Sequence, residues 1–307
     1  MSSATTIDAG WSKLPPEYRI PEVAPSVADA YAYCERLARS HYENFSVATF
    51  FLPKRLEQHF FNVYAYCRIS DDLGDEVGNV EQSLALLDAW EAELNACYAG
   101  APKHPVFVAL AGTVKEFNIP KQEFADLLTA FRRDQTITRF PTFSDVLDYC
   151  KYSANPVGHL VLYLGGYSDV ERQKLSDFTC TALQLANFWQ DVSVDWTKGR
   201  IYIPLEDMKR FGVCEEDIAN RRATPQFIEL MKFEVARARE WFANGLPLIQ
   251  KISPDLALDI ELFSRGGQEI LNAIEKQGYD VLKSRPAISK PRKLWLVVRA
   301  ALKKVAA

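Results

Sequence analysis

The chain has 307 residues, of which 48% are hydrophobic and 25% are charged, so it is long and apolar enough to bury a large core. A formal net charge of −4 gives no overall basic field, which makes nucleic acid a poor candidate partner. The six cysteines are widely spaced and include no CxxC pair, so they favour buried reduced thiols over a zinc or redox site.

The N-terminal residues have neither the basic nor the apolar region of a secretory signal. No apolar run reaches the roughly 18 residues that a membrane-spanning helix needs. We therefore expect a cytoplasmic location, with any membrane contact peripheral. Residues 1–25 contain four prolines and are predicted to be an extended lead-in.

Helical spacing of apolar residues dominates the rest of the chain. Ser26 and Asp29 are typical of a helix N-terminal cap and predict a helix over residues 26–40, and Pro53 suits the first turn of the next helix. Further helices are predicted at residues 80–99, 104–117, 121–138, 143–164, 169–196, 225–244 and 254–277. Strand signals are weak. We expect an all-α, single-domain bundle over residues 26–280.

The first informative segment is residues 64–76. At about 100° per residue, four side chains fall within an arc of about 60° on one helix face: Tyr64, Arg68, Asp71 and Asp75. Asp71 and Asp75 are about 6 Å apart along the axis, close enough to share magnesium ions. We call these four residues the first acidic stripe.

A second acidic stripe lies in the helix predicted at residues 169–196. Its members fall within about 80° of arc and are Gln184, Asn187, Asp191 and Asp195. The neighbouring Phe188 and Trp189 are strongly apolar, so the helix is not simply a charged outer helix. Carboxylates that project from apolar helices need a partner, and a divalent cation with diphosphate oxygens would supply one.

An ordinary solvated helix face is the competing interpretation of either stripe, and one stripe alone would favour it. Two stripes, each joined to aromatic or amide side chains, favour a functional role. A diphosphate leaving group concentrates negative charge, and metal ions that bridge it to carboxylates stabilise its departure.

These residues resemble the squalene and phytoene synthase family. Its two aspartate-rich motifs match residues 71–75 and 187–195, and the likeness runs from His41 to Tyr279. Residues 199–204 resemble the family's segment after the second motif. The resemblance implies an isoprenoid synthase helical bundle around a central cavity and a magnesium-dependent enzyme of diphosphate chemistry.

Residues 41–48 and 152–158 look like the HpnC-type hydroxysqualene synthase branch of the family. Where phytoene, dehydrosqualene and eukaryotic squalene synthases usually show Ala-Gly, this chain has Ala154-Asn155, followed by Pro156. Pro156 is compatible with a kink inside the predicted helix at 143–164 or with a helix boundary at Asn155.

The resemblance implies roles for particular residues. Magnesium would be held by Asp71, Asp75, Asn187, Asp191 and Asp195, with Asp72 in support. Diphosphate contacts are expected from Arg68, Gln184 and Arg200, because the arginine fork suits phosphate oxygens. Catalytic roles fall to Tyr64, Tyr152 and Arg68, and further substrate contacts to His41, Phe45, Tyr279 and Arg292. Plain core packing is the alternative for the aromatic residues.

The branch resemblance implies conversion of presqualene diphosphate and water to hydroxysqualene, in bacterial squalene and hopanoid synthesis. Alternatives are a presqualene diphosphate, squalene or phytoene-type synthase acting on farnesyl diphosphate, or a non-catalytic assembly factor of the same fold. Pathway enzymes are candidate partners.

Residues 281–307 carry eight basic side chains and no acidic one. This amphipathic segment suits either the anionic inner face of a membrane or a terminal helix packed on the bundle with a solvated basic face.

Overall fold

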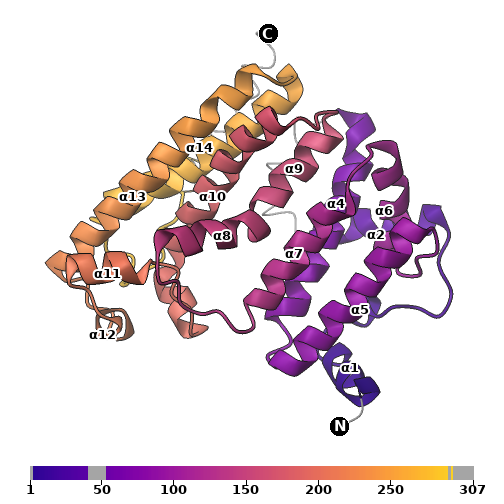
Figure 1. The fold of residues 1–307 in the computed structure, drawn as a ribbon, viewed down its shortest axis with the longest axis horizontal. Coiled ribbons are helices and arrows are strands. Elements are labelled where there is room, and N and C mark those ends of the chain that lie inside the picture. The colour runs from indigo at the N-terminus through magenta and orange to yellow at the C-terminus, as the bar shows by residue number, and fades with distance from the viewer. Residues whose placement is uncertain (1–2, 41–52, 290–291, 293–307) are drawn as a thin grey trace. The chain divides into compact units, whose positions relative to one another are not determined.

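The computed structural model describes residues 3–40, 53–289 and 292. These residues form helices and, apart from one isolated bridge between Arg139 and Ile201, contain no β-structure. The all-α class predicted from the sequence is confirmed (Figure 1). Each helix in the described ranges is too short or too polar to cross a lipid bilayer.

Contacts divide the described residues into two compact units, which we call unit 1 (within Met1–Thr136 and His159–Ser168) and unit 2 (within Ile137–Gly158 and Asp169–Ala307). Unit 1 contains α1 (Ser3–Trp11), a 3₁₀ turn (Pro16–Tyr18), α2 (Val27–Ser40), α4 (Lys54–Asp75), α5 (Val80–Ala99), α6 (Pro105–Glu116) and α7 (Lys121–Arg133). Unit 2 contains α8 (Phe143–Ser153), α10 (Val170–Thr197), α11 (Leu205–Phe211), α12 (Glu215–Ala219), α13 (Pro225–Gly245), a 3₁₀ turn (Leu246–Gln250) and α14 (Pro254–Lys276). Residues of α9 (Asn155–Leu164) belong to both units.

Buried aromatic rings fix the rotation of α4 in unit 1. The Tyr66 ring meets Phe124 edge to face with centroids 4.9 Å apart, and its hydroxyl donates to the Phe124 carbonyl at 2.8 Å. Ile69 and Leu73 are fully buried on the same side of the helix. Because Asp71 is offset from these residues by about half a turn, its side chain points away from the core.

A second aromatic cluster anchors α10 in unit 2. The rings of Phe188 and Tyr202 stack with centroids 3.9 Å apart and planes 6° apart. The Phe140 ring also stacks on Tyr202, with the two ring centroids 5.4 Å apart. The cluster joins the middle of α10 to the chain that follows its C-terminus.

The helix starts follow the capping signals of the sequence. The Ser26 hydroxyl accepts from the Asp29 amide at 3.2 Å and donates to its carboxylate at 2.6 Å, as the pattern predicts. Asn79 caps α5 by accepting from the amide of Gln82 at 2.9 Å, and Gly100, at φ +83°, ends that helix.

The extended lead-in predicted for residues 1–25 is wrong in part, because α1 and a 3₁₀ turn occupy much of it. α1 packs against α5, and Trp11, Leu14 and Tyr18 are buried in the core of unit 1. All four prolines follow α1, so none interrupts that helix, and burial of these apolar side chains stabilises the segment.

Two predicted helices are shorter than expected. The segment 143–164 is divided at Ala154 into α8 and α9, so the boundary interpretation of Pro156 holds and the proline lies in the first turn of α9. α7 ends at Arg133 rather than at residue 138, where the β-branched run 136–138 follows. The short helices α11 and α12 were not predicted.

Candidate active site

The carboxylate of Asp72 is held inside unit 1. Its side chain is 7% exposed, and it accepts hydrogen bonds from the Tyr18 hydroxyl at 2.8 Å and from Arg68 Nε at 3.0 Å, with a second Arg68 contact to its other oxygen. These contacts orient Arg68 along α4. Asp72 therefore holds Arg68 of the first acidic stripe in place, and both of its oxygens accept hydrogen bonds from protein donors.

Asp71 has the opposite environment. Its side chain is 51% exposed, with the nearest nitrogen of Arg68 at 3.8 Å. Asp75 follows one helical turn later and is half-buried. The two carboxylates of the first acidic stripe, Asp71 and Asp75, thus lie on the side of α4 that faces away from the core, as the spacing predicts.

Tyr64 completes the first stripe at its N-terminal end. The residue is half-buried, and burial raises the pKa of its hydroxyl, so the group stays protonated at neutral pH. A neutral phenol can donate one hydrogen bond and present its ring face to a cation.

The second acidic stripe runs along one side of α10. Asn187 is exposed, and Gln184, Asp191 and Asp195 are half-buried, whereas the intervening Phe188 is buried. The stripe is therefore a polar edge on a helix whose other sides are packed, and the helical spacing inferred from the sequence is confirmed.

Arg285 is a site neighbour that sequence reasoning missed. Its Nη2 donates to Asp191 Oδ2 at 3.0 Å and to Gln190 Oε1 at 3.1 Å, and its Nε also contacts the Asp191 carboxylate. The hydrogen bonds to Asp191 raise the pKa of Arg285, which keeps it cationic. The only sequence signal was its place among the basic residues after α14.

The C-terminus of α10 is closed by a left-handed turn. Gly199 has φ +75°, a conformation that costs glycine little, and the amide of Arg200 donates to the Asp195 carbonyl at 2.9 Å. The last acid of the second stripe and Arg200 are thereby joined through one turn of backbone.

Tyr279 and Arg292 both interact with α14. The Tyr279 hydroxyl donates to Glu275 Oε1 at 3.0 Å, and Arg292 forms a two-pronged contact with Glu269, at 2.9 Å from Nε and 2.7 Å from Nη2. Tyr152, near the end of α8, is half-buried and lies beside Lys151, whose ammonium is 5.5 Å from the ring centroid. His41 and Phe45 lie outside the described residues.

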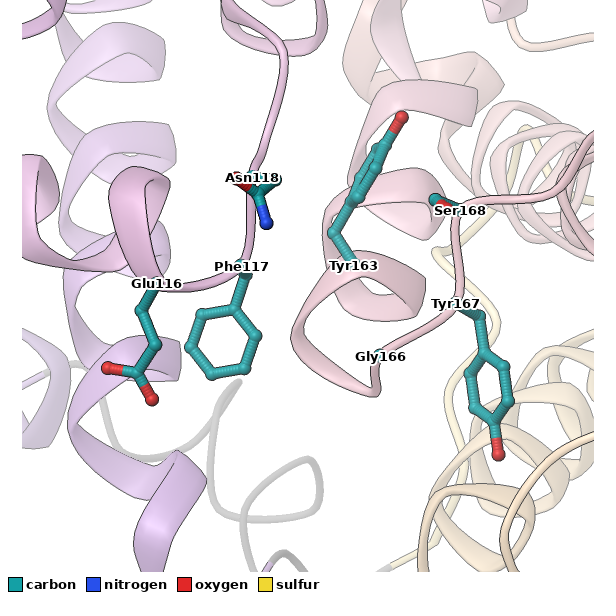
Figure 2. Close-up of a pocket in the computed structure, with 7 residues that line it drawn as sticks. All are labelled: Glu116, Phe117, Asn118, Tyr163, Gly166, Tyr167 and Ser168. Atoms are coloured by element: carbon teal, nitrogen blue, oxygen red, sulfur yellow. The ribbon is translucent and has the colours of Figure 1, made fainter.

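Unit 1 also contains a pocket of about 410 Å³ between the end of α6 and the end of α9 (Figure 2). Its lining residues are Glu116, Phe117, Asn118, Tyr163, Gly166, Tyr167 and Ser168. None of them was predicted as a site residue. In the close-up, Glu116, Phe117 and Asn118 lie on one side, and Tyr163, Gly166, Tyr167 and Ser168 lie on the other.

Comparison with known proteins identifies the family. The squalene/phytoene synthase family model matches residues 38–292, well over half of the chain. The chain belongs to the squalene/phytoene synthase family. Members of this family act on prenyl diphosphates, so the chain is an isoprenoid synthase of the head-to-head type. The resemblance inferred from the two motifs is confirmed.

Individual relatives represent several activities of the family. The 15-cis-phytoene synthase of Synechococcus elongatus is 30% identical over 281 residues, which cover 88% of this chain and 91% of that protein. Among solved structures, the squalene synthase HpnC from Alicyclobacillus acidocaldarius is 44% identical, with a TM-score of 0.79 over 88% of this chain and 98% of that one. A dehydrosqualene synthase solved with a ligand is 29% identical, with a TM-score of 0.82 over 92% and 98%.

The acidic stripes suit the family's diphosphate chemistry. The described residues contain no group of three or more His, Cys, Asp or Glu side chains that could hold a metal ion alone. Mg²⁺ needs fewer protein ligands, because it is usually bound by one or two carboxylates together with substrate phosphates and water. The carboxylates of Asp71, Asp75 and Asp195 are hard oxygen ligands of this kind, so they fit magnesium that is bound together with a diphosphate. Arg285 contacts both oxygens of Asp191, so Asp191 fits as a magnesium ligand only when that ion pair opens.

Proposed function

We propose that this family member converts presqualene diphosphate and water to hydroxysqualene and diphosphate. The observation that carries the proposal is the 44% identity to HpnC over nearly the whole length of both chains. The Ala154-Asn155 pair, which stands where other branches usually show Ala-Gly, supports the same assignment.

The reaction breaks the bond between carbon and the diphosphate oxygen, and both bonding electrons leave with diphosphate. Rearrangement of the cyclopropylcarbinyl cation follows, and water adds its oxygen to the cation and loses one proton. No reductant is consumed. Magnesium, when bound, neutralises charge on the leaving diphosphate.

The chain's own residues bind and orient the two ends of the substrate. Asp71 and Asp75 on α4, and Asn187, Asp191 and Asp195 on α10, are the proposed magnesium ligands. Arg68, Gln184 and Arg200 are proposed to hold the diphosphate oxygens, with Arg68 oriented by Asp72. Tyr64 and Tyr152 are proposed to present ring faces to the cation, and a hydroxyl to the incoming water.

Separate replacement of Asp71 and Asp191 by asparagine tests these roles. Each variant is expected to lose about 10²-fold or more of its magnesium-dependent diphosphate release from presqualene diphosphate, because a hard ligand is lost while side-chain volume is kept. Asp8→Asn, on the exposed side of α1, is a matched control and should turn over normally. Near-normal turnover by both site variants would refute the assignment.

A phytoene-type or presqualene-forming synthase is the second candidate, and the 30% identity to a phytoene synthase favours it. The same carboxylates would serve in either enzyme. Incubation with farnesyl diphosphate alone separates the two, because product formation from that substrate places the enzyme at a condensing step. Product from presqualene diphosphate only, identified as hydroxysqualene by mass spectrometry, supports the first proposal.

We also propose that the basic segment at residues 281–307 contacts an anionic membrane surface, from which a C30 lipid substrate would arrive. Most of this segment lies outside the described residues, and the argument is its charge, with eight basic side chains and no acidic one. Flotation with anionic liposomes tests it. The full chain should float, a chain that ends at Lys283 should float less, and equal flotation would exclude the role.

A further inference from the structure

The segment 138–141 runs beside the chain that leaves α10. The amide of Ile201 donates to the Thr138 carbonyl at 3.0 Å, and the amide of Leu205 donates to the Phe140 carbonyl at 2.9 Å. The isolated parallel bridge between Arg139 and Ile201 belongs to this contact. Two stretches of unit 2 that are 60 residues apart at Arg139 and Gly199 are therefore joined backbone to backbone.

Arg139 connects this contact to two other elements. Its Nε and Nη2 donate to the two carboxylate oxygens of Glu215, at 2.8 and 2.7 Å, which anchors it to the first turn of α12. Its Nη1 donates to the carbonyls of Thr138 at 2.8 Å and Gly199 at 2.6 Å. The guanidinium carbon also lies 5.8 Å from the ring centroid of Trp196.

The contact with Gly199 concerns the second acidic stripe directly. Gly199 is the left-handed residue that closes α10, and the chain changes direction there, between Asp195 and Arg200. Its carbonyl belongs to the peptide bond that carries the Arg200 amide, which donates back to Asp195. A donor on that carbonyl therefore fixes the plane of the peptide between Gly199 and Arg200.

The ion pair that holds Arg139 persists over a wide pH range. The hydrogen bonds between Arg139 and Glu215 lower the pKa of Glu215 and raise the pKa of Arg139. Both partners are partly exposed, at 27% for Arg139 and 40% for Glu215, so the pair adds little to global stability. Its geometry is a planar fork on a carboxylate with a third nitrogen on two carbonyls, which lysine cannot reproduce.

We propose that Arg139 is a positioning residue, which fixes the turn at Gly199 so that Arg200 and Asp195 are held ready for magnesium and diphosphate. The inference rests on the proposed role of α10 and Arg200 in diphosphate binding. Arg139 is not one of the proposed magnesium or diphosphate ligands. It acts through the Gly199 carbonyl, and Glu215 acts through Arg139.

The test compares Arg139→Lys, Arg139→Ala and Glu215→Gln with the wild type. The first readout is the affinity for inorganic diphosphate in saturating magnesium, measured by titration calorimetry. The second is the split between KM and kcat with presqualene diphosphate. We expect Arg139→Lys and Arg139→Ala to weaken diphosphate binding and raise KM about 10-fold or more, and Glu215→Gln to do so by a smaller factor, because the loosened turn must be ordered on binding.

Arg132→Ala is the matched control. Arg132 is 26% exposed and pairs with Asp88 and Glu91 on α5, far along the sequence from the stripe of α10. The Arg132→Ala variant should keep wild-type affinity for diphosphate and wild-type KM. Its melting temperature should change slightly, by about as much as that of the Arg139 variants. If Arg139→Ala fails to fold, the lysine and Glu215 variants carry the test.

Wild-type diphosphate affinity and KM in Arg139→Lys and Glu215→Gln would overturn the inference, as would losses that Arg132→Ala shares. Failure of the proposed function looks different. The wild-type protein would then release no diphosphate from presqualene diphosphate, while the calorimetric comparison with inorganic diphosphate would still decide the role of Arg139.

Discussion

Asp71 and Asp72 are adjacent carboxylates with different roles, and their substitutions should have different effects on stability and activity. Asp72→Asn removes the charge that accepts from Tyr18 and Arg68 in a buried setting, so we expect the free energy of unfolding to fall by about 1–3 kcal/mol. Asp71→Asn changes a side chain that is 51% exposed and should alter stability by less than about 0.5 kcal/mol, while activity falls. Urea denaturation measures both.

Tyr18→Phe provides the control for this pair. It removes one hydrogen bond from Asp72 and leaves the Arg68 contacts, so its loss of stability should be smaller than that of Asp72→Asn. Equal unfolding free energies for Asp71→Asn and Asp72→Asn would contradict the division of duties.

Glu234 on α13 is a buried carboxyl that should make stability depend on pH. Its pKa is raised to about 8 from an ordinary value of 4.5, chiefly by burial, while Arg237 lowers the pKa and Asp207 raises it. Arg237 Nη1 lies 2.8 Å from Asp207 and 3.1 Å from Glu234, so two carboxylates share one cation. At neutral pH the native state therefore keeps a proton on Glu234 that the unfolded chain has released.

The sign of the effect follows from that proton. The contribution of Glu234 is fully present below its unfolded pKa and is lost as pH rises through about 8, with a slope of at most about 1.4 kcal/mol per pH unit. Glu234→Gln should flatten the fall in stability between about pH 5 and 8, measured by urea denaturation across that range. Glu240→Gln, exposed on the same helix, should leave the wild-type profile intact. An unchanged slope in Glu234→Gln would count against a protonated Glu234 in the native state.

Neighbouring glycines on α14 give a paired test of helix packing. A methyl group on Gly267 would lie 2.4 Å from Phe242 Cζ and 2.8 Å from Leu183 Cδ2, whereas one on Gly266 would meet nothing within 4 Å. Gly267→Ala should therefore cost about 1–3 kcal/mol. Gly266→Ala should gain up to about 1 kcal/mol, because alanine favours the helix. Thermal melts of the two variants should shift in opposite directions, and a shared direction would mean that the close approach of α14 to α10 and α13 relaxes easily.

Elements with local signals were predictable from the sequence. Ser26 and Asn79 cap helices that begin where their side chains indicate, because a cap depends on residues three positions apart. α1 was not predictable in the same way, since its helix is stabilised by burial of Trp11 against a distant part of the chain. The end of α7 and the break at Ala154 did have local signals, in the β-branched run 136–138 and in Pro156, for which the sequence left a kink and a helix boundary both open.

At the scale of the whole molecule, the parts of the candidate site that lie on one helix were predictable, and the contacts between residues distant in sequence were not. Each acidic stripe lies on one helix, so the period of 3.6 residues places its members together without knowledge of the fold. Arg285 contacts Asp191 across 94 residues, and Arg139 contacts Glu215 across 76. No spacing rule connects such pairs, and for a single sequence only the folded structure reveals them.

The proposed function requires Asp71 and Asp191, on separate helices, to serve one diphosphate group, and a double variant tests that requirement. If both ligands act as parts of one binding unit, loss of the first already removes most of the assistance to ionisation, and little remains for the second substitution to remove. We expect Asp71→Asn and Asp191→Asn to cost about 10²–10³-fold each in kcat/KM, and the double variant to cost far less than the product of the two. Single-turnover diphosphate release at saturating magnesium is the measurement. A double variant whose loss equals that product would mean that the two carboxylates act independently, and the shared role would have to be abandoned.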